Sequence, residues 1–204
     1  MNLRRRPILV WGLAISGGVA LGLASAVAAL MIAPRMGMVE RGGWIGHPAA
    51  GSAQASPYAR ALIARIGLLA MSREEAVYLD RTRNDAGQRL RGDCRYALQG
   101  RVPPARWWSI TLYAEDNYLA RNGQNAPSID ATSVSVSDDL WRAEVGPIRP
   151  ADGRPWIASG GGDHFTLTLR LYRPTTDVFA ADAGSVGPTV TKLECPSSAK
   201  DGAP

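Results

Sequence analysis

Residue types that commonly carry chemistry are scarce in this sequence. Its 204 residues include two histidines and only two cysteines, Cys94 and Cys195. Two cysteines this far apart cannot form a C-x-x-C redox motif, and their number excludes a cysteine-based zinc set. Among the 23 basic residues only Lys192 and Lys200 are lysine. We therefore expect no metal site and no cofactor.

A strong excess of one charge is also missing from the part of the chain that should fold. The formal net charge is +5, but Arg4, Arg5 and Arg6 precede a long apolar run. Without these three, 20 basic residues face 18 acidic ones. The sequence has no clustered basic face and no recognisable DNA- or RNA-binding motif, so we expect no nucleic-acid partner.

Charged side chains are absent between Ile8 and Ala33. As a helix this segment reaches ~39 Å, and the hydrocarbon core of a bilayer is ~30 Å thick. The arginines before it favour a cytoplasmic N-terminus, residues 1–7, and export of everything after Pro34. We predict a single-pass transmembrane anchor over residues 8–33.

A cleaved signal peptide is the alternative interpretation of the same segment. Ala24-Ser25-Ala26 offers small residues at the spacing that a signal peptidase needs. The apolar stretch continues through Met31 and Ile32, beyond the usual length of a signal core, which favours the uncleaved anchor. Both interpretations export the domain.

Small residues recur every four positions in the anchor, with Gly18 and Gly22 at the centre. Such a face lets two helix backbones approach closely, so it could form a homodimer. Glycine and alanine are also simply common in membrane helices, which leaves the plainer explanation open.

Two segments of different character follow the anchor. Residues 34–56 are rich in glycine and proline, which predicts a flexible tether to the folded domain, 57–196. Trp44 in that tether could contact the lipid interface or dock on the domain. Ser56-Pro57 then resembles a helix start, and the apolar spacing predicts an amphipathic helix over residues 57–71 that covers one face of a sheet.

Beyond Ser72 the apolar period changes to two, which is typical of strands. Residues 76–80 and 94–98 flank a turn at 84–87 and predict a hairpin. Further strands are expected at 107–113, 133–137, 141–145, 164–172 and 189–193, and the tail 197–204 should be disordered. Short strands with Gly/Pro turns predict a mostly β domain, a β-sandwich or jelly-roll-like fold.

Three strings in this domain resemble a known bacterial family. They are Cys94-Arg95-Tyr96, residues 102–113 (VPPARWWSITLY) and residues 165–174 (FTLTLRLYRP). Over about residues 42–196 the chain resembles the family called domain of unknown function 1214. The resemblance implies an all-β domain of a bacterial envelope protein. Together with the predicted anchor, a bacterial source puts residues 8–33 in the inner membrane and the domain in the periplasm. Larger relatives carry a second, N-terminal β module that this chain lacks, and the family implies no established activity.

The two cysteines should form a disulfide if the domain is exported. Cys94 begins a predicted strand and Cys195 follows the last one. In an oxidising compartment such a pair normally bonds, and in the chain-entropy model closing this loop would stabilise the fold by ~4 to 5 kcal/mol, at the upper end of the usual effect of a disulfide. Two unpaired thiols are the alternative.

Asp163, His164 and Ser159 lie near glycines and invite a hydrolase interpretation. The nucleophile motif Gly-x-Ser-x-Gly is not met, because Ile157 occupies the first glycine position and a strand follows. Surface strand residues are therefore the simpler interpretation. Trp107 points away from Trp108 and could stack on a sugar, but packing under the helix 57–71 is favoured.

Arg89, Arg91 and Arg95 form a candidate patch for an anion or a lipid headgroup. Asp80, Asp85 and Asp93 are interleaved with them, so a neutralised, solvated face is favoured.

Two functional hypotheses result. The first is a non-catalytic, membrane-anchored module that binds a protein partner or a ligand in the envelope. The alternative is an envelope enzyme or carbohydrate-acting domain with a cleft that gathers Asp163, His164 and Trp107.

Overall fold

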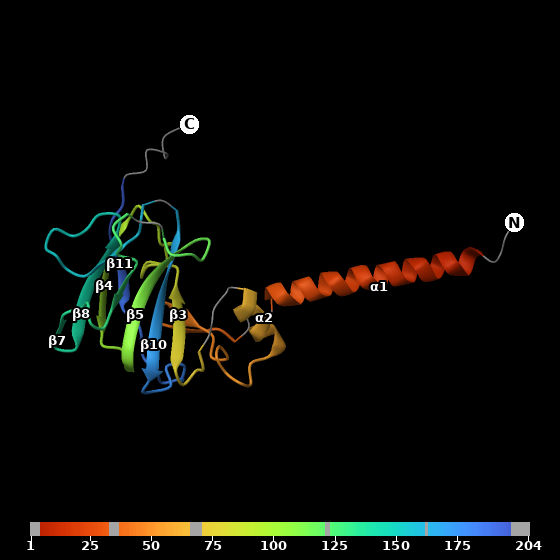
Figure 1. The fold of residues 1–204 in the computed structure, drawn as a ribbon, viewed down its shortest axis with the longest axis horizontal. Helices are drawn as coiled ribbons and strands as arrows, with labels where there is room; N and C mark the ends of the chain where they lie inside the picture. The colour runs from red at the N-terminus through yellow and green to blue at the C-terminus, as the bar shows by residue number, and fades with distance from the viewer. Residues whose placement is uncertain (1–4, 33–36, 66–70, 121–122, 162, 197–204) are drawn as a thin grey trace.

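The computed structural model describes residues 5–32, 37–65, 71–120, 123–161 and 163–196. Helix α1 (Arg5–Ile32) projects away from a β domain (Figure 1). Its stretch Val10–Ile32 has a mean hydropathy of 2.0 and no part of it is buried by the rest of the chain. This helix is long and apolar enough to span a membrane or to act as a signal sequence. Gly18 and Gly22 lie on it with open space around them.

The domain consists of two sheets that face each other as a sandwich (Figure 1). The six-stranded sheet has the order β1 (Val39–Arg41), β2 (Trp44–Gly46), β3 (Ala76–Arg81), β10 (Phe165–Pro174), β5 (Ala105–Ala114) and β6 (Ser128–Asp130). The other sheet has the order β11 (Thr189–Glu194), β4 (Arg95–Arg101), β8 (Leu140–Gly146) and β7 (Val136–Ser137), and β9 (Trp156–Ala158) pairs with β8 in parallel. The mostly β, sandwich-like fold class is confirmed.

Alternating apolar side chains from both sheets fill the space between them. On β10 the four predicted inward residues, Phe165, Leu167, Leu169 and Leu171, are all buried. The indole of Trp108 on β5 stacks on that of Trp141 on β8 with ring centroids 4.7 Å apart. This contact spans the two sheets. Aromatic pairs at this distance stabilise a fold beyond the contribution of their buried area.

The predicted hairpin over residues 76–98 is wrong. Strand β3 pairs with β10 and β2, whereas β4 pairs with β8 and β11 in the opposite sheet. Between them only an isolated bridge joins Arg83 to Arg89. The chain crosses from one sheet to the other here, and the apolar faces of β3 and β4 line the same core from opposite sides.

The structure also differs from the predicted tether at residues 39–46. Strands β1 and β2 form the edge of the six-stranded sheet, and Trp44 is fully buried. Its indole Nε1–H donates to the carbonyl of Pro188 at 2.8 Å. Gly43 has a φ of +83°, and a side chain there would collide with the guanidinium of Arg81. The glycines thus form a tight turn between two strands and not a flexible linker.

Helix α2 (Pro57–Arg65) begins where the sequence predicts, with the Ser56 hydroxyl accepting a hydrogen bond from the amide of Ala59. Residues 66–70 of the predicted helix lie outside the described residues, as does the predicted tail 197–204, and Met71 is not helical. The helix lies beside β2 and β3 (Figure 1). It does not cover Trp107, which is half-buried and packs on Tyr172 instead.

Candidate functional site

The cleft that would gather Trp107 with Asp163 and His164 does not form. On the paired strands, Trp107 lies opposite Tyr172, whereas Ala114 lies opposite Phe165, the residue after His164. Seven residues of extended strand separate these two ends, a distance of ~23 Å. Trp107 and His164 therefore lie at opposite ends of the six-stranded sheet.

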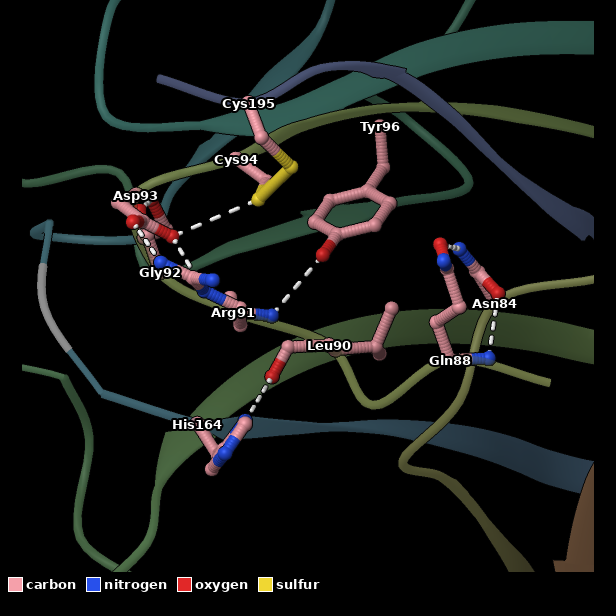
Figure 2. The surroundings of a disulfide bond; sticks show 11 residues. Asn84, Gln88, Leu90, Arg91, Gly92, Asp93, Cys94, Tyr96, His164 and Cys195 are labelled. Carbon is pink, nitrogen blue, oxygen red and sulfur yellow. Dashed lines mark hydrogen bonds and ion pairs between the residues drawn. A yellow bond between two sulfur atoms is a disulfide. The ribbon is translucent and has the colours of Figure 1, made fainter. Parts of the chain in front are cut away.

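Asp163 and His164 do share a pocket of about 310 Å³ with Ser159, Glu115 and Asp116. The Ser159 hydroxyl is buried and donates to the carbonyl of Gly92, so it is occupied by a structural hydrogen bond. The imidazole Nδ1 of His164 lies 3.0 Å from the carbonyl of Leu90, which implies an Nδ1–H donor (Figure 2). These contacts fasten one loop to another and leave no activated nucleophile in this group.

The predicted arginine patch divides into two parts. Arg95 lies between Glu194 and the buried carboxylate of Glu144, which Arg154 also binds. The Arg95–Glu144 contact, 2.8 Å long, connects strands β4 and β8. Arg89 pairs with Glu115 and Arg91 with Asp93, and these two arginines stay together near the disulfide.

The structure contains the disulfide between Cys94 and Cys195, which closes a loop with a sequence separation of 101 residues. It joins the start of β4 to the end of β11 (Figure 2). The amide of Arg91 donates to the hydroxyl of Tyr96 beside it, at 2.9 Å. The bond therefore ties the last strand to the segment that precedes β4.

A pocket that the sequence did not indicate lies between α2 and the outer face of the six-stranded sheet. Its volume is about 200 Å³. Apolar side chains form most of its wall, with α2 contributing Ala59 and Ile63 and the β1–β2 region contributing Met38, Ile45 and Ala50. Tyr78 and Thr82 come from β3 and the residues after it, and His47 follows β2.

One carboxylate, that of Asp80 on β3, also faces this pocket. The register places Asp80 directly between Ile45 of β2 and Thr168 of β10. The hydroxyl of Thr168 donates to it at 2.6 Å. Asp80 forms no ion pair with any residue that the structure describes.

The surroundings of Asp80 raise the pKa of its carboxyl group above the ordinary value. The largest cause is desolvation by the protein around it, which the hydrogen bond from Thr168 and the charge of Arg170 oppose. Solvent still reaches the side chain through the open mouth of the pocket. This exposed carboxylate has a hydroxyl partner and no ion pair among the described residues, so it stays available to a ligand in the pocket.

His47 offers a second polar group in the same pocket. Its Nδ1 accepts a hydrogen bond from the amide of Ala49 at 3.1 Å. The proton of the neutral imidazole therefore lies on Nε2. With Asp80 as an acceptor and His47 Nε2 as a donor, the pocket can bind a ligand with both kinds of polar group.

The sequence pattern contained only a partial signal for this site. Asp80 alternates with Leu79 and was expected among the acids that neutralise the nearby arginines. That expectation holds for Asp85, which pairs with Arg81, and for Asp93. It is wrong for Asp80, because its neighbours come from α2, β2 and β10, which are distant in the sequence.

Comparisons with known proteins identify the family. Residues 75–176, half of the chain, match the family described as "Protein of unknown function (DUF1214)". The chain belongs to the DUF1214 family. No curated protein matches it.

Two solved structures are similar to this DUF1214 chain. The VPA0106 protein from Vibrio parahaemolyticus is 20% identical, with a TM-score of 0.56 over 69% of this chain and 36% of that one. An uncharacterised protein from Burkholderia cenocepacia is 15% identical, with a TM-score of 0.44 over 58% of this chain and 30% of that one. The first likeness supports the fold alone, and the DUF1214 chain spans about a third of the length of these proteins.

The DUF1214 match covers only part of the pocket lining. It begins at Glu75 and so includes Tyr78, Asp80 and Thr82, which form the floor on β3. The walls from the β1–β2 region and from α2 lie outside the matched range. The floor is therefore shared with the family region, and the cover is built by the segment that precedes it.

Proposed function

We propose that this chain is a non-catalytic binding module, anchored in the bacterial inner membrane, that holds a small ligand between α2 and the six-stranded sheet. The observation that carries the proposal is the carboxylate of Asp80. It faces an otherwise mostly apolar pocket, and it has no ion-pair partner among the described residues. A ligand that donates to this carboxylate from a protonated amine would form a charge-assisted hydrogen bond, which is stronger than a neutral one.

The lining defines the class of ligand. The aliphatic and alanine side chains favour a compact apolar body, and Asp80 favours a protonated amine or another strong hydrogen-bond donor. The volume of about 200 Å³ suits a small group, such as one ring or a short branched chain. We expect a cationic amphiphile, or the cationic end of a larger molecule.

The anchor supports a location close to the bilayer. Met38 in the pocket wall follows the last residue of α1, Ile32, by six residues. Six residues of extended chain reach at most ~22 Å, so this wall lies near the end of the helix. If α1 spans the inner membrane with its arginines in the cytoplasm, the pocket lies on the periplasmic side, within reach of molecules at the membrane surface.

The test uses three probes that share a cyclohexyl ring. Cyclohexylmethylamine, cyclohexylmethanol and cyclohexanecarboxylate are titrated calorimetrically into the full chain in neutral detergent micelles. We expect the amine to bind most tightly. Asp80→Asn should weaken amine binding by about ten-fold or more while leaving the alcohol nearly unchanged, because only the charge-assisted contact is lost.

Two further variants make the result specific. Ile63→Trp should abolish binding of all three probes by filling the pocket. Asp182→Asn removes an exposed carboxylate elsewhere and should change nothing. Equal affinity for the three probes, or an unaltered amine affinity in Asp80→Asn, would contradict the proposal.

A further inference from the structure

A second cavity lies at the disulfide, on a different part of the domain. Its volume is about 360 Å³, and Cys94, Tyr96 and Cys195 form part of its lining. The remaining lining comes from Gln88, Arg89 and Arg91, from His164 before β10, from Lys192 on β11 and from Pro196. Figure 2 shows Gln88, Arg91 and His164 around the disulfide. Segments that are far apart in the sequence therefore meet here.

The charged side chains that line this cavity are cationic. Arg89, Arg91 and Lys192 line it together with His164, and no aspartate or glutamate does. The acidic partners of the two arginines, Glu115 and Asp93, pair with them from outside the lining. Lys192 forms no ion pair with a described residue. The charges of the two arginines are thus largely balanced by their acidic partners, and the excess positive charge that favours an anion comes from Lys192.

The covalent and hydrogen-bonded frame holds these cations in place. The disulfide keeps the end of β11, with Lys192, against β4, where Lys192 lies opposite Tyr96. The Tyr96 hydroxyl accepts the amide hydrogen of Arg91 at 2.9 Å. The ring of His164 is oriented by the carbonyl of Leu90, next to Arg91 (Figure 2). Binding groups that are fixed before the ligand arrives lose less entropy on binding.

We propose that this cavity is an anion site that binds a phosphoryl group. Arg89 can offer N–H donors to phosphate oxygens beside its contact with Glu115, and Lys192 adds a point charge. The site is independent of the pocket at Asp80: the lining residues of the two cavities do not overlap. The phosphoryl group can belong to a soluble phosphate compound or to a lipid headgroup, since both present the same oxygens.

The experiment measures binding of two probes to the full chain in neutral detergent micelles. Inorganic pyrophosphate, the soluble probe, is titrated calorimetrically. Phosphatidylglycerol, the lipid probe, is added to the micelles and its retention is read by native mass spectrometry. We expect at least one probe to bind, and Lys192→Glu to weaken it by about ten-fold or more.

The matched control is Arg106→Glu. Arg106 is exposed at the start of β5, at the opposite end of the six-stranded sheet from His164. This variant makes the same kind of charge reversal and should bind either probe as the wild type does. Circular dichroism of both variants confirms that the fold is kept, which is expected because both side chains are exposed.

The outcomes separate cleanly. Pyrophosphate binding that Lys192→Glu removes and Arg106→Glu retains supports a site for soluble phosphate compounds. The same pattern with phosphatidylglycerol alone supports a headgroup site. Absence of binding by both probes, or an equal loss in the two variants, overturns the proposal, because an equal loss reflects only the net charge of the protein.

Discussion

Asp80 illustrates how much a single residue depends on its surroundings. The strand alternation correctly places it on the outer face of β3, where a charged side chain is expected to be solvated. The side chain is indeed exposed, but it also faces the pocket beside α2, and desolvation by the surrounding protein raises the pKa of the carboxyl group. No local pattern around residue 80 could have shown this, because the neighbours come from other parts of the chain.

The raised pKa of Asp80 predicts how its removal affects stability. A carboxyl group whose pKa is higher in the folded state lowers the free energy of unfolding once the pH exceeds its ordinary range. Asp80→Asn keeps the oxygen that accepts from Thr168 and removes the charge. We expect this variant to melt at a higher temperature than the wild type at pH 7.

The difference should shrink as the pH falls toward and below the ordinary range of aspartate, because the wild-type carboxyl group is then neutral as well. Thermal melts between pH 3 and pH 8 measure this directly. Asp182→Asn, at an exposed position, is the control and should follow the wild type. A lower melting temperature for Asp80→Asn at pH 7 would show that the charge stabilises the fold.

At the scale of elements, long alternating strands were predictable and the short ones were not. Strands β10 and β5 have clear two-residue periods, and the sequence indicates which apolar side chains line the core. It did not indicate that Ser109 and Thr111, on the other face of β5, are buried as well. Strands β1, β2, β6 and β9 have three residues each, too few for a period to emerge. Glycines around β1 and β2 suggested a linker because a tight turn and a flexible segment have similar compositions.

Trp44 provides the test of the β1–β2 edge. It is fully buried, and its indole donates to the carbonyl of Pro188. Trp44→Ala should lower the free energy of unfolding by ~3 to 5 kcal/mol, the range for large buried aromatic side chains. Trp107→Ala, at a half-buried outer position, should cost clearly less. Urea denaturation compares them, and a Trp44→Ala midpoint equal to that of the wild type would mean that residues 39–46 are a tether after all.

At the scale of the whole molecule, the disulfide between Cys94 and Cys195 should contribute to the stability of the fold. Cys94→Ser and Cys195→Ser should each lower the free energy of unfolding by ~2 to 4 kcal/mol, which for a domain of this size is ~5 to 15 °C in melting temperature. The double variant should lose no more than either single variant, because all three lack the same bond. Additive losses in the thermal melts would show that the two cysteines act separately.

The topology of the whole chain rests on the arginines that precede α1. A reporter enzyme that is active only in the periplasm, fused after Pro204, should be active, because the positive-inside rule keeps the arginine side in the cytoplasm. Replacing Arg4, Arg5 and Arg6 by serine is the matched control and should reduce that activity. An inactive fusion, with a cytoplasmic reporter active in its place, would contradict export of the domain.

The pocket between α2 and the sheet should hold a small ligand when the protein is in its native membrane. Native mass spectrometry of the full chain purified from its own envelope tests this most directly, with Ile63→Trp purified in parallel. We predict that the wild type retains an apolar molecule with a protonated amine or a comparable donor, and that Ile63→Trp lacks it because the indole fills the pocket. The same small-molecule content in both proteins would contradict the account.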